Sequence, residues 1–285
     1  MQGIHTALVT PFADDGSVDL ACFERLCQRQ LDAGIHGLVP CGTTGETPTL
    51  EPTEWSTLVA AAVSVAAGRV PVTAGVGTNS TRSTVRLVAA AAELGVDHGL
   101  LVFPYYNKPN TAGLRAHVKE ALSVGLPLVL YHVPGRTGQR LSEGLLADLA
   151  SLPGVVGVKE ATGDLKYGTD VMAKTSTPIL SGDDFSFLGL LAQGGRGCIS
   201  VLSNVAPAQT VAVYDAFRAG RVEEATRRFR ALYELVGFLF SEPNPVPCKA
   251  AMAALGLCDA RVRLPLASWS GGDCGDLVQR ALAEA

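Results

Sequence analysis

The chain has 285 residues, of which 47% are apolar and 18% charged, and its formal net charge is -4. This composition excludes a disordered or fibrous chain, because it supplies enough apolar surface for a folded core. It also argues against nucleic-acid binding, which goes with a clustered basic excess, and no apolar run reaches the ~20 residues that span a bilayer.

The first residues, MQGIHTALVTPF, lack the basic start and long apolar run of a secretion signal. The seven cysteines are odd in number and form no Cys-x-x-Cys pair. They predict reduced, mostly buried thiols and neither a disulfide framework nor a zinc site. We therefore expect a cytoplasmic protein without a metal.

Eight short runs that are apolar on both faces predict the strands of a parallel sheet covered by helices. Longer helical patterns separate them, and several open on a capping residue such as Ser80 or Ser142. Strands are expected at residues 3–9, 37–40, 70–74, 99–102, 127–131, 155–158, 178–180 and 197–201, and helices at 20–33, 52–67, 80–94, 111–124 and 142–150.

Eight repeated βα units favour an α/β fold of the (β/α)8 TIM-barrel type. An open doubly wound sheet is the alternative, but it often carries a phosphate-binding glycine loop after its first strand, where this chain has Thr10-Pro11-Phe12. We expect the barrel to comprise residues 1–220. Residues 221–285 then form a C-terminal helical extension, with helices at 222–240, 247–255 and 276–285.

Lys159 is the most informative residue of the chain. Of six lysines it alone directly follows an apolar strand, residues 155–158, and catalytic groups of barrels stand at such strand ends. Burial there would lower the pKa of the amine and leave it nucleophilic. The alternative is a lysine whose stem covers apolar surface while its head reaches water.

Three other candidate groups stand at or after the ends of predicted strands. Tyr131 could move protons, or be an ordinary half-wet tyrosine. Thr43 and Thr44 stand between two glycines, where backbone N–H groups and hydroxyls could face a carboxylate, or simply form a capped tight turn. Arg136, expected in a loop, could hold a carboxylate through two parallel hydrogen bonds, or be solvated.

Other patterns in the sequence do not complete a cofactor, metal or nucleophile site. The Gly75-Val76-Gly77 run lacks the third glycine of a dinucleotide fingerprint. Asp183-Asp184 has no cluster to complete a metal shell, and Cys41 has no recognisable histidine arrangement. His132 follows Tyr131, so in a strand it points to the opposite face.

Six motifs occur in the order and spacing of one family, and they span nearly the whole chain. The motifs are Gly42-Thr43-Thr44-Gly45-Glu46, Pro104-Tyr105-Tyr106-Asn107, Tyr131-His132-Val133-Pro134-Gly135-Arg136-Thr137-Gly138, Val158-Lys159-Glu160-Ala161-Thr162, Leu180-Ser181-Gly182-Asp183-Asp184 and Glu242-Pro243-Asn244-Pro245-Val246-Pro247. In these motifs the chain resembles the dihydrodipicolinate synthase family, within the pyruvate-dependent class I aldolases.

The resemblance implies a reaction between two small molecules, without metal or organic cofactor. Pyruvate would form a Schiff base with Lys159 and condense with L-aspartate 4-semialdehyde to 4-hydroxy-tetrahydrodipicolinate, in diaminopimelate and lysine biosynthesis. It also implies a homotetramer built from tight dimers. Tyr131, Thr44 and a neighbouring subunit's Tyr106 would relay protons, Thr43 and Thr44 would hold the pyruvate carboxylate, Arg136 would hold that of the second substrate, and Gly182 and Ile199 would line the site through backbone groups.

Two other functions stay open at this point. One is a related aldolase or dehydratase of the N-acetylneuraminate lyase or 2-oxo sugar acid type, against which Arg136 argues. The other is a non-catalytic barrel that binds a metabolite. Feedback inhibition by lysine is expected to be weak or absent, because Pro52, Trp55 and Ser83 replace the imidazoles and carboxylate of the lysine site in sensitive relatives.

Overall fold

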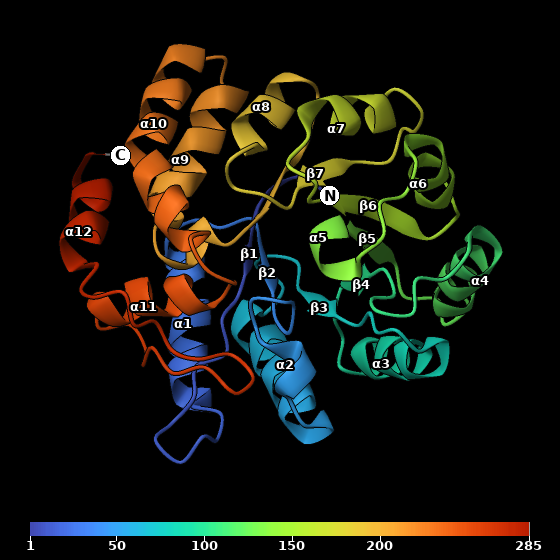
Figure 1. The fold of residues 1–285 in the computed structure, drawn as a ribbon, viewed down its shortest axis with the longest axis horizontal. Helices are drawn as coiled ribbons and strands as arrows, with labels where there is room; N and C mark the ends of the chain where they lie inside the picture. Colours follow the sequence, from blue (N-terminus) through green and yellow to red (C-terminus); the bar gives the residue numbers. More distant parts are fainter. Residues whose placement is uncertain (285) are drawn as a thin grey trace. The chain divides into compact units, whose positions relative to one another are not determined.

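Eight β-strands alternate with helices in the computed structural model, which describes residues 1–284 (Figure 1). The strands belong to one sheet, and the paired strands run parallel. This is the (β/α)8 barrel fold that the sequence predicted. The strands are β1 (Gly3–Ala7), β2 (Gly37–Val39), β3 (Thr73–Gly75), β4 (His98–Val102), β5 (Leu128–His132), β6 (Val155–Glu160), β7 (Ile179–Ser181) and β8 (Gly197–Ser200).

The chain divides into two compact units. The central unit comprises Met1–Gln2 and Pro71–Ile199, and its strands pair in the order β8-β7-β6-β5-β4-β3. The terminal unit comprises Gly3–Val70 and the residues from Ser200 onward, and in it β1 pairs with β2. The boundary predicted at residue 220, between barrel and extension, stays a prediction.

Helices cover the strands of the central unit, with α3, α4, α6 and α7 on the outside of β3 to β7 (Figure 1). All five residues of β5 are buried, as expected for a strand covered on both faces. The predicted capping residues are confirmed, since Ser80 accepts a hydrogen bond from the Ser83 N–H and Ser142 from the Leu145 N–H. The helices are α3 (Thr81–Glu93), α4 (Thr111–Leu122), α5 (Pro134–Thr137), α6 (Glu143–Ala150), α7 (Leu165–Met172) and α8 (Phe187–Ala192).

The helices of the terminal unit include the predicted C-terminal extension, α10 to α12. In this unit α9 and α10 lie side by side (Figure 1). No helix within residues 1–284 combines the length and the apolar character that crossing a membrane requires. The helices are α1 (Leu20–Asp32), α2 (Pro52–Ala66), α9 (Pro207–Arg218), α10 (Val222–Leu239), α11 (Val246–Ala254) and α12 (Gly275–Glu284), with 3-10 helices η1 (Thr47–Thr49) and η2 (Leu202–Asn204).

Candidate active site

Lys159 lies within β6 and not directly after it, because the strand continues to Glu160. The Cα atoms of Lys159 and Tyr131 are partners across the parallel pair β5–β6, so the two side chains leave the same face of the sheet. The Lys159 Nζ atom lies 4.3 Å from the centroid of the Tyr131 ring, within reach of a cation–π contact. Both residues are 5% exposed. The amine of Lys159 and the ring of Tyr131 thus lie next to each other in the protein interior.

Burial alone does not single out Lys159, because Lys249 of the terminal unit is buried as well. The Nζ atom of Lys249 donates to Glu46 Oε1 at 2.5 Å and to the Arg261 carbonyl at 2.7 Å. Within residues 1–284, no carboxylate forms an ion pair with Lys159. Of the two buried lysines, Lys249 is therefore engaged in a buried ion pair, and the assignment of Lys159 as the nucleophile stays a prediction.

Gly182 makes room for the side chain of Lys159. It directly follows β7, and its N–H donates to the Glu160 carbonyl at 2.7 Å. A Cβ atom added to Gly182 would lie 2.8 Å from both Cγ and Cε of Lys159, which is closer than non-bonded carbons approach. Glycine at position 182 therefore leaves free the space that the Lys159 side chain occupies. The other predicted lining residue, Ile199, lies on β8 and is fully buried.

We expect Gly182→Ala to slow the trapping of pyruvate on Lys159 by borohydride at least about tenfold, because the added methyl must displace the lysine stem. The rate is measured by mass spectrometry of the intact protein. The matched control is Gly144→Ala on α6, where an added Cβ meets nothing within 4 Å. Equal trapping rates in the two variants would contradict the steric role.

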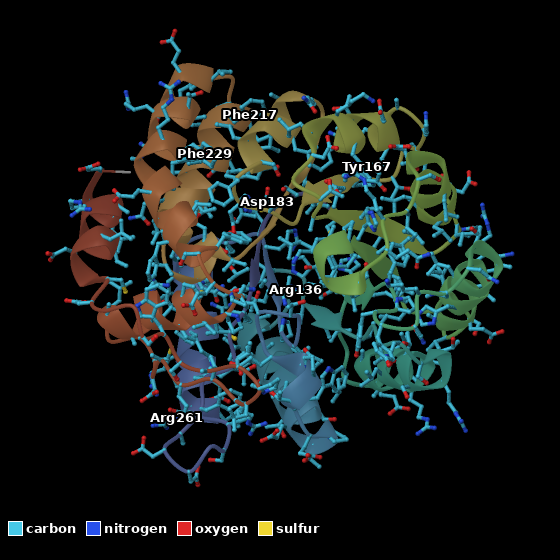
Figure 2. All side chains as sticks on the ribbon, viewed as in Figure 1. Arg136, Tyr167, Asp183, Phe217, Phe229 and Arg261 are labelled. Atoms are coloured by element: carbon cyan, nitrogen blue, oxygen red, sulfur yellow. The ribbon has the colours of Figure 1, made fainter. Side chains whose placement is uncertain are left out.

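Arg136 and Tyr106 are exposed residues of the central unit. Arg136 lies on the short helix α5 and not in the predicted loop, because Pro134 opens a helical turn that the Gly138 N–H closes by donating to the Pro134 carbonyl at 2.8 Å (Figure 2). Tyr106 lies between β4 and α4, is 89% exposed and has a φ of 70°. That left-handed conformation is uncommon for a residue other than glycine.

The threonine pair lies in the terminal unit, in the turn Gly42–Glu46 after β2. The Gly45 N–H donates to the Gly42 carbonyl and the Glu46 N–H to the Thr43 carbonyl, each at 3.1 Å. A Cβ on Gly45 would lie 3.2 Å from backbone atoms, so this glycine does permit the close backbone approach that the sequence predicted. Thr44 is 2% exposed and Thr43 is half-buried.

Two residues of the C-terminal part hold this turn. Asn244 Nδ2 donates to Thr44 Oγ1 at 2.8 Å, and Lys249 holds Glu46. Sequence reasoning assigned neither residue a role, although Asn244 stands within a recognised motif. The signal that could have found Asn244 is its place as the one side-chain amide among the prolines of Glu242–Pro247.

His132 and Glu160 lie on the opposite face of β5 and β6 from Lys159, as the strand alternation predicted for His132. The His132 ring is fully buried, and its centroid lies 5.6 Å from that of Tyr167 on α7. Burial lowers the pKa of His132 to about 4. Burial also raises the pKa of Glu160 to about 7, against the opposing hydrogen bond from the Thr162 N–H at 2.7 Å.

Ionisation of Glu160 is expected to weaken the fold as the pH rises. Its pKa in the folded protein, about 7, lies above its ordinary value of 4.5, so the stabilisation is complete below pH 4.5 and is lost as the pH rises to 7. The shift is worth roughly 3 kcal/mol. Glu160→Gln keeps an acceptor for Thr162 and cannot ionise. In urea denaturation, the free energy of unfolding of the variant minus that of the wild type should therefore rise by about this amount between pH 4.5 and 7. A difference that does not change with pH would contradict the prediction.

Known proteins resemble this chain over nearly its whole length. A model described as the dihydrodipicolinate synthetase family matches residues 1–281. A curated relative from Hyphomonas neptunium is 48% identical over 270 residues, covering 93% of this chain and 92% of the relative, and one from Methanoculleus marisnigri is 43% identical, covering 93% of each. Both are named 4-hydroxy-tetrahydrodipicolinate synthase.

Solved dihydrodipicolinate synthase structures also superpose closely on this chain. The dihydrodipicolinate synthase of Thermotoga maritima superposes with a TM-score of 0.95 at 40% identity, covering 100% of this chain and 98% of that one. The chloride-inhibited enzyme of Acinetobacter baumannii, complexed with pyruvate, gives a TM-score of 0.94 at 39% identity, covering 99% of this chain and 98% of that one. A monomeric dihydrodipicolinate synthase variant gives 0.95 at 39% identity, covering 100% and 96%.

The barrel fold, taken with these relatives, defines a lyase of the pyruvate-dependent class I aldolase type. Within that class, the chain belongs to the dihydrodipicolinate synthetase family. The family and the activity predicted from the sequence are thereby confirmed, since the curated relatives carry the name of that activity.

Proposed function

We propose that this protein condenses pyruvate with L-aspartate 4-semialdehyde to 4-hydroxy-tetrahydrodipicolinate, through a Schiff base on Lys159. The observation that carries the proposal is the environment of Lys159. Its amine is buried over the Tyr131 ring and, within residues 1–284, is not paired with a carboxylate, whereas the other buried lysine is held by Glu46. The proposed first substrate is also the ligand of the Acinetobacter baumannii structure.

The proposed reaction begins when neutral Lys159 attacks the ketone carbon of pyruvate. Loss of water gives an imine, and loss of a methyl proton gives an enamine, with the imine nitrogen as the electron sink. The enamine carbon attacks the aldehyde of the second substrate. The amine of that substrate then attacks the imine carbon, which closes the ring and releases Lys159.

The other candidate residues receive roles according to their chemistry. We assign the proton relay to Tyr131, Thr44 and Tyr106, whose hydroxyls can each donate and accept. Thr43 and Thr44 would bind the pyruvate carboxylate, and Arg136 that of the semialdehyde, since a guanidinium binds a carboxylate in a bidentate manner. Gly182 and Ile199 would line the site.

A neighbouring subunit would supply Tyr106, and a homotetramer made of two tight dimers is the proposed assembly. The 89% exposure of Tyr106 in the single chain supports this, because an aromatic side chain that its own chain does not cover can contact a partner subunit. For the compartment we propose the cytoplasm. All seven cysteines are free thiols, which a reducing compartment preserves.

Substitutions of Arg136 test the identity of the second substrate. We expect Arg136→Ala to raise the KM for L-aspartate 4-semialdehyde about 10- to 100-fold and Arg136→Lys to raise it less, because lysine lacks the bidentate geometry. Initial rates are measured with both substrates varied. Trapping of pyruvate on Lys159 should stay at the wild-type level in both variants.

The matched control is Arg82→Ala, an exposed arginine on α3, which should leave both KM values unchanged. A wild-type protein that traps pyruvate but does not consume the semialdehyde would overturn the assignment of the second substrate. A wild-type protein that traps no pyruvate would overturn the Schiff-base chemistry itself.

A further inference from the structure

The hydroxyl of Thr44 is held by a residue far away in the chain. Asn244 lies in the loop between α10 and α11, and its Nδ2 atom donates to Thr44 Oγ1 at 2.8 Å across 200 residues of sequence. Thr44 is 2% exposed and Asn244 9%. Bulk water therefore competes little for this contact, and its direction matters for the chemistry of the hydroxyl.

The direction follows from the donor inventory of the two groups. A side-chain NH₂ has donors and no acceptor, whereas a hydroxyl has one proton and two lone pairs. In this contact Thr44 is therefore the acceptor. Its own proton is left for a different partner, which is the state that a proton-relay hydroxyl requires.

Prolines and backbone hydrogen bonds restrain the loop that carries Asn244. Prolines stand on both sides of Asn244 and restrict its backbone. The Val246 N–H donates to the Pro243 carbonyl at 3.0 Å, and the Lys249 N–H to the Pro245 carbonyl at 2.9 Å. Since Lys249 also binds Glu46, this segment contacts the turn Gly42–Glu46 through two side chains, Asn244 and Lys249.

We propose that Asn244 is a positioning residue for the reaction: its amide donates to Thr44 and so leaves the proton of the threonine hydroxyl free to be donated in the proposed proton relay. This inference rests on the proposed function, because it assigns Asn244 to the relay that contains Thr44. It adds to that function a residue of the C-terminal segment.

The test is Asn244→Asp, which preserves shape but reverses the hydrogen bond. An ionised carboxylate can only accept, so it draws the Thr44 proton toward itself. We expect kcat to fall about tenfold or more at neutral pH, with a smaller change in the KM for pyruvate. As the pH is lowered, the introduced carboxyl becomes protonated and can donate again. The ratio of variant to wild-type kcat should therefore rise toward acid pH.

A second variant and a double mutant separate positioning from folding. Asn244→Ala should lower kcat without the recovery at acid pH, since it offers no donor at any pH. In a Thr44→Val background, Asn244→Asp should change kcat less than about twofold, because the hydroxyl that it orients is gone. The control is Ser241→Ala in the same loop, whose hydroxyl donates to the Phe238 carbonyl and which should keep the wild-type kcat.

Thermal unfolding of each variant is recorded beside the kinetics. Wild-type kcat in both Asn244 variants, a kcat ratio for Asn244→Asp that does not vary with pH, or full additivity with Thr44→Val would overturn the inference. If the wild-type protein itself fails to condense the two substrates, the proposed function fails instead, so the two failures are distinguishable.

Discussion

Lys159→Ala should lower kcat by at least about 10³-fold and abolish the borohydride-trapped pyruvate adduct, because the variant has no amine to form the imine. The fold should persist, since alanine leaves β6 and its pairing with β5 and β7 in place. Peptide mapping of the trapped wild-type protein measures the site of the adduct. Steady-state assay of the variant measures the loss.

The matched control for this experiment is Lys166→Ala. Lys166 lies on α7, its side chain is 84% exposed, and it forms a surface ion pair with Asp170. Its removal should leave both adduct and kcat at wild-type levels. An adduct on any lysine other than Lys159 would overturn the assignment of the nucleophile.

Lys249→Met should lower the free energy of unfolding by about 3–5 kcal/mol, because it leaves the Glu46 carboxylate buried without its counter-ion. The side chains of Lys249 and Glu46 are 0% and 1% exposed, and Nζ and Oε1 lie 2.5 Å apart. Lys249 also lies over the Phe12 ring, with Nζ 4.2 Å from its centroid. Equilibrium denaturation in urea measures the change.

Two further variants distinguish a lost ion pair from a lost side chain. Lys249→Met combined with Glu46→Gln should be destabilised by less than the sum of the two single changes, since no buried charge then lacks a partner. Gln at this position can still accept from the Arg263 N–H, which lies 2.8 Å from Glu46 Oε2. Arg280→Met removes an exposed pair with Glu234 and should cost at most about 1 kcal/mol. Strict additivity in the double variant would contradict a coupled pair.

Prediction from sequence succeeded where a local pattern carries the information. The apolar runs located all eight strands, although β3 begins at Thr73 and not at residue 70, and β6 continues through Lys159 to Glu160. Arg136, predicted in a loop after Pro134 and Gly135, lies on a helix instead, since a proline is suited to the first turn of a helix. Such boundary differences depend on hydrogen bonds that a sequence pattern does not reveal.

The barrel, the family and the candidate nucleophile Lys159 were predictable from the amino-acid sequence, because strand periodicity and strand-end motifs are local properties of the chain. Which buried lysine forms an ion pair, and which residue binds the Thr44 hydroxyl, became known from the folded structure. Those answers rest on the contacts of Lys249 with Glu46, 203 residues apart, and of Asn244 with Thr44, 200 residues apart. No local pattern encodes such contacts, since folding alone brings the C-terminal segment onto the turn after β2.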